Sequence, residues 1–300
     1  MEPSLQSLAG IADVAWLGRK DAPPSRTLLV EVPHGADELA HFAHLAAQME
    51  GPLPASLEVF FFANTDRGAY AYGRRTAELL LEQGTVDRAL IVRCLIPRTL
   101  VDANRLIDSE DHLAEGGLTG AIPAYIEHPG DRRRLRDLHR RYVELADRAY
   151  DAVCGGGGLA LCPHTYGPRS MGIARVDAHI VAALRDAYAP GTWESWPLRP
   201  EVDLITSDTE GRYLADRALA ARVLKAFADL GWPAIDGGTY KLHPQTTGAR
   251  YCERYPGRVL CLEIRRDLLV VKFDLLSAVE LDVNAVERAA RALASAYRAD

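Results

Sequence analysis

Residues 27–35 read TLLVEVPHG, a continuous apolar and β-branched run followed by Pro-His-Gly. Such a run is typical of a strand that is buried on both faces of a sheet. Four more apolar runs follow along the chain: LEVFFFA at 57–63, ALIVRCL at 89–95, LALC at 159–162 and RVLCLEI at 258–264. We expect each of these runs to form a strand.

Segments with a helical spacing of apolar residues alternate with these runs, at 37–49, 69–83, 131–152, 207–230 and 282–298. Ser207 or Asp208 would cap the fourth of them. The alternation predicts an α/β fold, with a mostly parallel or mixed central sheet and helices on both faces. With no repeat and no low-complexity linker, we expect residues 1–300 to form a single domain. The irregular stretch 168–200 would be a lid or an excursion from it.

The composition argues against several classes of protein. The chain has 300 residues, 48% of them hydrophobic, and a formal net charge of -6, so it has material for a core and no basic excess for nucleic acid. No apolar run approaches the roughly 20 residues of a membrane helix, and the first residues lack a signal-peptide pattern. The five cysteines include no C-x-x-C pair. We therefore expect a soluble cytoplasmic protein.

Candidate metal ligands follow three of the predicted strands. His34 follows the first run, Asp66 the second and His164 the fourth. Ligands of α/β sheets bind beyond the carboxyl ends of strands, and two histidines with one carboxylate are a usual catalytic zinc arrangement. Each residue also has a structural reading, as a histidine bonded within its loop or as an aspartate that caps the next helix. Two Pro-His pairs after different buried strands are less easily explained by the structural reading, but the spacing alone leaves both readings open.

A carboxylate stands inside the last apolar run. A period of two places Glu263 and Arg265 on the same face of that strand. A buried carboxylate without a partner costs several kcal/mol, so we expect a metal, an arginine or a catalytic proton beside it. The structural alternative is an ion pair with Arg265 or Arg266.

Taken together, these segments resemble the N-formylglutamate amidohydrolase family, which is similar to the zinc carboxypeptidases in fold and chemistry. The matching pieces occur in the family's order: VPHG at 32–35, NTDRGA at 64–69, PRTLVDANR at 97–105, PHT at 163–165 and LEIRRDL at 262–268. They extend over most of the chain, from about residue 28 to about residue 268. The resemblance implies a zinc carboxypeptidase-like fold.

The resemblance also implies a role for each matching residue. One zinc ion per chain would be held by His34 and His164, with Asp102 orienting His34. Glu263 would take a proton from the zinc-activated water and later give it to the departing amine. Arg98 would polarise the scissile carbonyl or help to bind the substrate carboxylate. The substrate carboxylate would be gripped by Asn104, Arg105 and Arg265, since arginine is suited to bidentate carboxylate binding.

The third metal ligand stays open between two acids. The zinc carboxypeptidases carry an acid three residues after the first histidine, which here is Asp37, followed by Glu38. The formylglutamate hydrolases keep the later aspartate, which here is Asp66, and we favour it.

Three departures from the family lie around the metal core: Cys162 replaces an aspartate, Tyr142-Val143 replaces a Tyr-His pair and Leu262 replaces a glutamine. They put N-formylglutamate itself in doubt as the substrate. Residues 239–250 take the place of the family's substrate-proximal loop, where Lys241, His243 and Arg250 would contact an anionic substrate or be solvated.

The predicted function is zinc-dependent hydrolysis of a small N-acyl amino acid, N-formyl derivatives included, or of a related amide that bears a carboxylate. One alternative is a zinc carboxypeptidase of small peptides. Another is a non-catalytic protein that binds a carboxylate ligand on the same fold. The expected partner is a small anionic amide or short peptide, without nucleic acid or membrane, and the sequence does not predict the oligomeric state.

Overall fold

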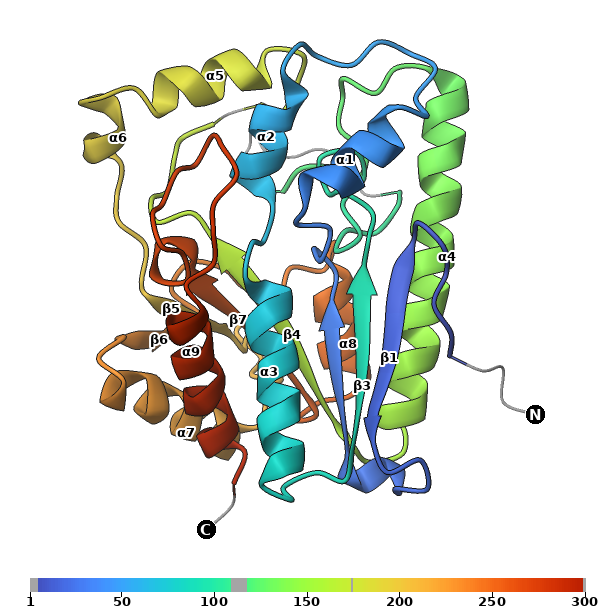
Figure 1. Ribbon diagram of the computed structural model, residues 1–300, viewed down its shortest axis with the longest axis vertical. Helices are drawn as coiled ribbons and strands as arrows, with labels where there is room; N and C mark the ends of the chain where they lie inside the picture. Colours follow the sequence, from blue (N-terminus) through green and yellow to red (C-terminus); the bar gives the residue numbers. More distant parts are fainter. Residues whose placement is uncertain (1–4, 109–117, 174, 299–300) are drawn as a thin grey trace.

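The computed structural model describes residues 5–108, 118–173 and 175–298. Residues 1–4, 109–117, 174 and 299–300 lie outside these ranges. In these ranges, strands form a mixed seven-stranded sheet in the order β1-β3-β2-β4-β7-β5-β6 (Figure 1). The strands are β1 (Ala12–Gly18), β2 (Thr27–Val32), β3 (Arg88–Cys94), β4 (Leu159–Tyr166), β5 (Val202–Ile205), β6 (Ala234–Asp236) and β7 (Val259–Arg265).

The centre of the sheet is parallel and its flanks are not. β3, β2, β4 and β7 run parallel to one another, whereas β1 pairs antiparallel with β3 and β5 antiparallel with β7. β2 and β7 are buried along their whole length, as the continuous apolar runs predicted. The predicted α/β fold with a mixed central sheet is confirmed.

Helices cover both faces of the sheet and form two cores. The helices are α1 (Leu39–Ala46), α2 (Leu57–Asn64), α3 (Ala69–Glu82), α4 (Pro129–Val153), α5 (Ile180–Ala187), α6 (Thr192–Ser195), α7 (Arg217–Asp229), α8 (Thr247–Arg254) and α9 (Val283–Ala296). On one face α3, α7 and α9 pack together, and the core of the other face is built by α4 and α8 with α1, α2 and α5. No helix in the described ranges has the length and apolarity that crossing a membrane requires.

The prediction of a strand at residues 57–63 is wrong, because these residues belong to helix α2. A short apolar run can be a buried strand or a buried helix, and periodicity alone does not separate them. Leu57 and Phe61, four residues apart, are the buried positions of α2. Phe61 stacks on Phe42 of α1 with ring centroids 5.4 Å apart. Packing against α1 therefore decides the structure of this segment.

The structure also corrects two predicted boundaries. β4 continues through Pro163 and His164, so His164 lies within a strand and not after it. The helix expected from residue 207 begins only at α7, where the Asp216 side chain accepts from the Leu219 amide at 2.7 Å. Asp208 instead closes a turn by accepting from the Arg212 amide at 2.8 Å. β1, β5 and β6 were not predicted, since their sequences lack a sustained apolar run.

Candidate metal centre

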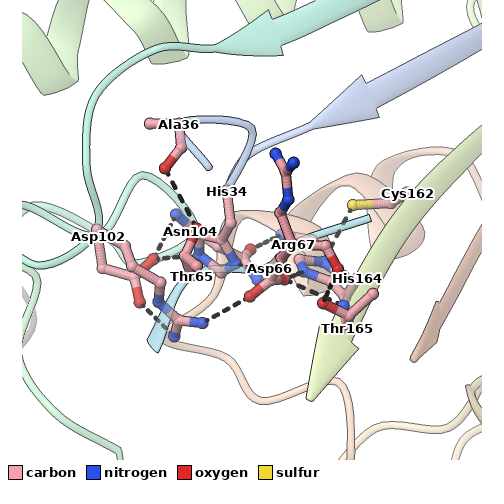
Figure 2. Close-up of polar contacts among 12 residues, drawn as sticks. His34, Ala36, Thr65, Asp66, Arg67, Asp102, Asn104, Cys162, His164 and Thr165 are labelled. Carbon is pink, nitrogen blue, oxygen red and sulfur yellow. Dashed lines mark hydrogen bonds and ion pairs between the residues drawn. The ribbon is translucent and has the colours of Figure 1, made fainter. Parts of the chain in front are cut away.

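Three buried side chains meet at the carboxyl end of the central strands. His34 follows β2, Asp66 follows α2 and His164 lies in β4, and one ligand atom from each lies within 4.8 Å of the others. Both imidazoles direct Nδ1 at the same oxygen, Oδ2 of Asp66, at 3.1 Å for His34 and 2.9 Å for His164 (Figure 2). This His-Asp-His group could hold a metal ion.

The backbone after β2 sets the position of His34. Gly35 passes so close to β3 that a Cβ on it would lie 2.5 Å from Cγ of Arg93 and 2.9 Å from the Cys94 carbonyl oxygen. Only glycine permits this approach. The turn that it allows places the His34 ring over the end of the sheet, opposite His164, with ring centroids 5.1 Å apart.

An outer layer of charges holds the first histidine and the aspartate. His34 Nε2 lies 2.7 Å from Oδ1 of Asp102, the place that the family resemblance implied for that residue. Arg98 donates to Asp66 at 3.2 Å and to Asp102 at 3.0 Å. Burial alone would raise the pKa of Asp66, but the His34 charge, the bonds to both imidazoles and Arg98 outweigh it and hold that pKa well below its usual range.

A different set of partners holds the second histidine. Nε2 of His164 lies 3.4 Å from the Cys162 thiol, which donates to Glu31 at 3.3 Å. Tyr142 also donates a hydrogen bond to Glu31, a fully buried residue of β2. Cys162 is one of the positions at which the chain differs from the family that it resembles, and Tyr142 directly precedes another, Val143. The carboxylate nearest to His164 on this side is therefore Glu31 of the neighbouring strand β2, and the Cys162 thiol connects the two residues.

The donor atoms of the group fit a metal ion. Because His34 Nε2 bonds to the Asp102 carboxylate, Nδ1 is the ring nitrogen left to face Asp66. Two imidazole nitrogens and a carboxylate oxygen at these distances require positive charge between them, supplied by ring protons or by a cation. Burial by itself lowers the pKa of His164, but its hydrogen bond to Asp66 and the Glu263 charge outweigh it and raise the pKa to about 9.

Asp37, the alternative third ligand, lies apart from this group. Its carboxylate is 2.8 Å from Arg93 and 3.2 Å from Arg67. Glu38 also reaches Arg93, at 3.2 Å. Both acids are thus engaged by arginines, whereas Asp66 faces both histidines.

Glu263 lies beside the group on the adjacent strand. In the parallel pairing of β4 with β7 it is the register partner of His164. Its Oε2 atom is buried and has no hydrogen-bond partner among the described residues. Burial raises the pKa of Glu263 to about 8, against the lowering effect of the His164 charge.

Neither arginine that follows Glu263 forms the ion pair considered as the structural alternative. Arg265 turns to Asp267 at 2.9 Å and to Glu201 at 3.4 Å. Arg266 donates to the carbonyl oxygens of Phe62 and Ala63, at 2.9 and 3.3 Å.

A cavity of about 540 Å³ opens over the group, and several predicted substrate residues line it. Arg98, Asn104 and Arg105 are among them, but Arg265 is not. The Asn104 side-chain oxygen accepts from the Gly248 amide at 3.0 Å, which ties this loop to the start of α8. Arg105 is almost fully buried, and its Nε has no hydrogen-bond partner within the described part of the chain. Such a guanidinium favours an anion in the cavity.

The residues 239–250 divide between the cavity and the surface. Lys241 and His243 line the cavity. Arg250 pairs with Asp147 at 2.6 Å and lines a different, smaller hollow.

Sequence reasoning missed Glu31 and Arg199. Glu31 interrupts the apolar run TLLVEV in the way that Glu263 interrupts its own run, so the same signal was present. Arg199, which lines the cavity, stood in the irregular stretch with no motif to indicate it.

The mixed sheet and the buried His-Asp-His group define an α/β protein with a candidate metal centre. No protein-family model matches the sequence, and no curated protein matches it. The fold is shared with solved structures, among them the following two. N-formylglutamate amidohydrolase from Ralstonia eutropha JMP134 is 15% identical with a TM-score of 0.54, and 96% of each chain is covered. A gene product of Agrobacterium tumefaciens is 17% identical with a TM-score of 0.52, covering 98% of this chain and 96% of that chain.

Proposed function

We propose that this chain is a zinc-dependent amide hydrolase that acts on a small N-acyl amino acid, N-formyl derivatives included, or on a related amide that bears a carboxylate. The observation that carries the proposal is the buried His34–Asp66–His164 group with Glu263 beside it in one cavity, where Oε2 of Glu263 has no hydrogen-bond partner among the described residues. The fold shared with N-formylglutamate amidohydrolase supports it.

Zinc is the metal that the donor set favours. Two imidazole nitrogens and one carboxylate, with a position left for water or substrate, are typical of catalytic zinc. A zinc ion held by these three residues would acidify a water molecule and polarise the carbonyl of the substrate. The five cysteines are all buried free thiols, which supports the expectation of a reducing, cytoplasmic setting.

Glu263 moves the protons in the proposed reaction. Its carboxylate, which lines the cavity, takes a proton from the attacking water, whose oxygen forms a bond to the amide carbon. The carbon–nitrogen bond then breaks, and the same carboxyl group gives its proton to the departing nitrogen. A cation beside Glu263 lowers the pKa of that residue from its raised value, which makes the carboxylate available as a base.

The arginines hold the substrate and the site. Arg98 is held by two carboxylates and lines the cavity, where its guanidinium would polarise the scissile carbonyl. Arg105 supplies the buried guanidinium that binds the substrate carboxylate, next to Asn104.

We expect Arg105→Lys to reduce kcat/KM for an N-acyl amino acid about ten- to hundredfold, because lysine cannot form two parallel bonds to a carboxylate. The neutral amide analogue, which lacks that carboxylate, should lose far less. Arg265→Lys is the matched control, since Arg265 is equally buried but does not line the cavity. Equal losses on both substrates would show that Arg105 acts only structurally.

The same assay separates the proposal from its alternatives. N-formyl and N-acyl amino acids are assayed beside dipeptides on the zinc-loaded chain. Faster turnover of dipeptides would indicate a small-peptide carboxypeptidase. Binding without turnover of any amide would indicate a non-catalytic carboxylate-binding protein.

A further inference from the structure

The cavity over the candidate metal centre is lined by two chemically different sets of side chains. One, called the cationic wall, includes Arg98, Arg105, Arg199 and Lys241, and Arg169 and Arg266 also line the cavity. The other, the apolar wall, consists of Phe60, Met171, Ile173, Val176, Ile180 and Leu184. A carboxylate-bearing substrate accounts for the first wall and leaves the second unexplained.

The apolar wall begins about one helical turn from the metal centre. On α2 the residues that line the cavity are Phe60, Ala63 and Asn64, which share one face of the helix. Asn64 is two residues from Asp66, and Phe60 lies one turn further away, about 6 Å along the helix axis. α5 packs against α2, as Figure 1 shows, and contributes Ile180 and Leu184 from successive turns.

The irregular stretch that carries the rest of the apolar wall is fixed at its base. The Ser170 amide donates to the Pro197 carbonyl at 2.9 Å, and the Arg199 amide donates to the Pro168 carbonyl at 2.8 Å. The Arg169 guanidinium donates to the Trp196 carbonyl at 2.6 Å. Ile180 and Leu184 are also buried members of the core. The base of the stretch and the α5 part of the apolar wall are therefore held by the fold itself.

The size of the cavity exceeds what a one-carbon acyl group needs. At the roughly 30 Å³ that a molecule of liquid water takes up, 540 Å³ has room for about 18 non-hydrogen atoms. Cavities of this size usually bury most of their ligand, and apolar side chains favour apolar ligand surface. An N-formyl group would leave the apolar wall facing water.

We propose that the substrate is an N-acyl amino acid whose acyl group is bulky and apolar, such as a benzoyl or hexanoyl group, which lies against the apolar wall. This inference rests on the proposed function. Hydrolysis adds water across the carbon–nitrogen bond and yields an apolar carboxylic acid and an amino acid with a free amine. The carboxylate of an N-acyl amino acid lies on the nitrogen side of the amide and matches the cationic wall. The acyl group on the other side of the amide therefore contacts the apolar wall.

The test compares N-formyl-, N-hexanoyl- and N-benzoyl-L-glutamate on the zinc-loaded chain. We expect kcat/KM for the hexanoyl or the benzoyl compound to exceed that for the formyl compound at least about tenfold. A formyl compound that equals or exceeds both would overturn the inference. N-formyl-L-phenylalanine is the further arm: faster turnover of it than of N-benzoyl-L-glutamate would assign the apolar wall to the amino-acid side chain and overturn the acyl assignment.

Variants of α2 locate the effect. Phe60→Ala should lower the ratio of benzoyl to formyl kcat/KM about tenfold. Phe62→Ala is the matched control, because Phe62 is on the same helix and half-buried but does not line the cavity, and it should keep the wild-type ratio. Met171→Ala, at a half-buried position of the apolar wall, serves if Phe60→Ala does not fold. An unchanged ratio in the folded wall variants, or equal falls in wall variant and control, would contradict the inference.

A binding measurement keeps this test separate from that of the proposed function. If none of the amides is hydrolysed, the proposed function fails. Calorimetric titration of the zinc-loaded wild-type chain with N-benzoyl- and N-formyl-L-glutamate still reports on the apolar wall. Binding of the benzoyl compound about tenfold more tightly supports the wall as an apolar subsite. Equal affinities would overturn it.

Discussion

Glu263→Gln is expected to lower kcat by about 10² to 10⁴, or roughly 3 to 5 kcal/mol of barrier, because general base catalysis is typically of that size. Glutamine keeps the shape of the side chain but cannot take a proton. Since Glu263 is not one of the three residues that converge on the metal position, zinc content and substrate binding should stay near those of the wild type.

A structural role for Glu263 gives a different result. An ion pair with a buried arginine would be lost in Glu263→Gln, and the melting temperature would fall while the folded fraction kept its activity. The structure opposes this reading, because within the described residues Oε2 has no hydrogen-bond partner and Arg265 pairs with Asp267 and Glu201 instead. Zinc content, melting temperature and kcat are measured on one preparation. A stable, zinc-loaded variant with near-wild-type kcat would remove the catalytic assignment.

Asp66→Ala is expected to have the second large effect, the loss of most of the zinc and with it the activity. Oδ2 of Asp66 faces both imidazoles, so its removal takes away one ligand and leaves Arg98 with one carboxylate partner fewer. Removing one partner of a buried charge network typically costs about 3 to 5 kcal/mol, so the melting temperature should fall as well.

Asp37→Ala is the control for that variant. Asp37 is held by Arg67 and Arg93, so its loss should leave the zinc content nearly unchanged. Elemental analysis of both variants decides the third ligand. A greater loss in Asp37→Ala would place this protein nearer the carboxypeptidase pattern, and negligible loss in both would exclude both acids.

Burial in the sheet is the property that made parts of the fold predictable. β2 and β7 lie between two layers of helices, so their sequences are apolar throughout, and the runs at 27–32 and 258–264 indicated them. The run at 57–63 misled because a short helix packed against α1 needs the same composition. β1 lies at an edge of the sheet, where partial exposure removes the signal, and β5 has only four residues, among them the buried Asp203.

The candidate site was predictable where its chemistry requires particular residue types, such as histidine and aspartate for a metal ion. The prediction named His34, Asp66 and His164, which the fold brings together although Asp66 follows a helix and His164 lies within a strand. The direction of a side chain is harder to predict from the sequence. Arg265 was expected to contact the substrate, but its guanidinium pairs with Asp267 and Glu201. The partnership of Cys162 with Glu31 depends on the pairing of β2 with β4, which one sequence does not specify.

The metal content of the purified chain tests the central claim most directly. We expect about one zinc per chain in the wild type, bound by two histidines and one carboxylate. His34→Ala and His164→Ala should each lose it, because each removes one of the Nδ1 atoms that face Asp66. Elemental analysis on folded protein gives the answer. A wild-type chain that binds no zinc after loading, or full zinc retained by both variants, would contradict the account.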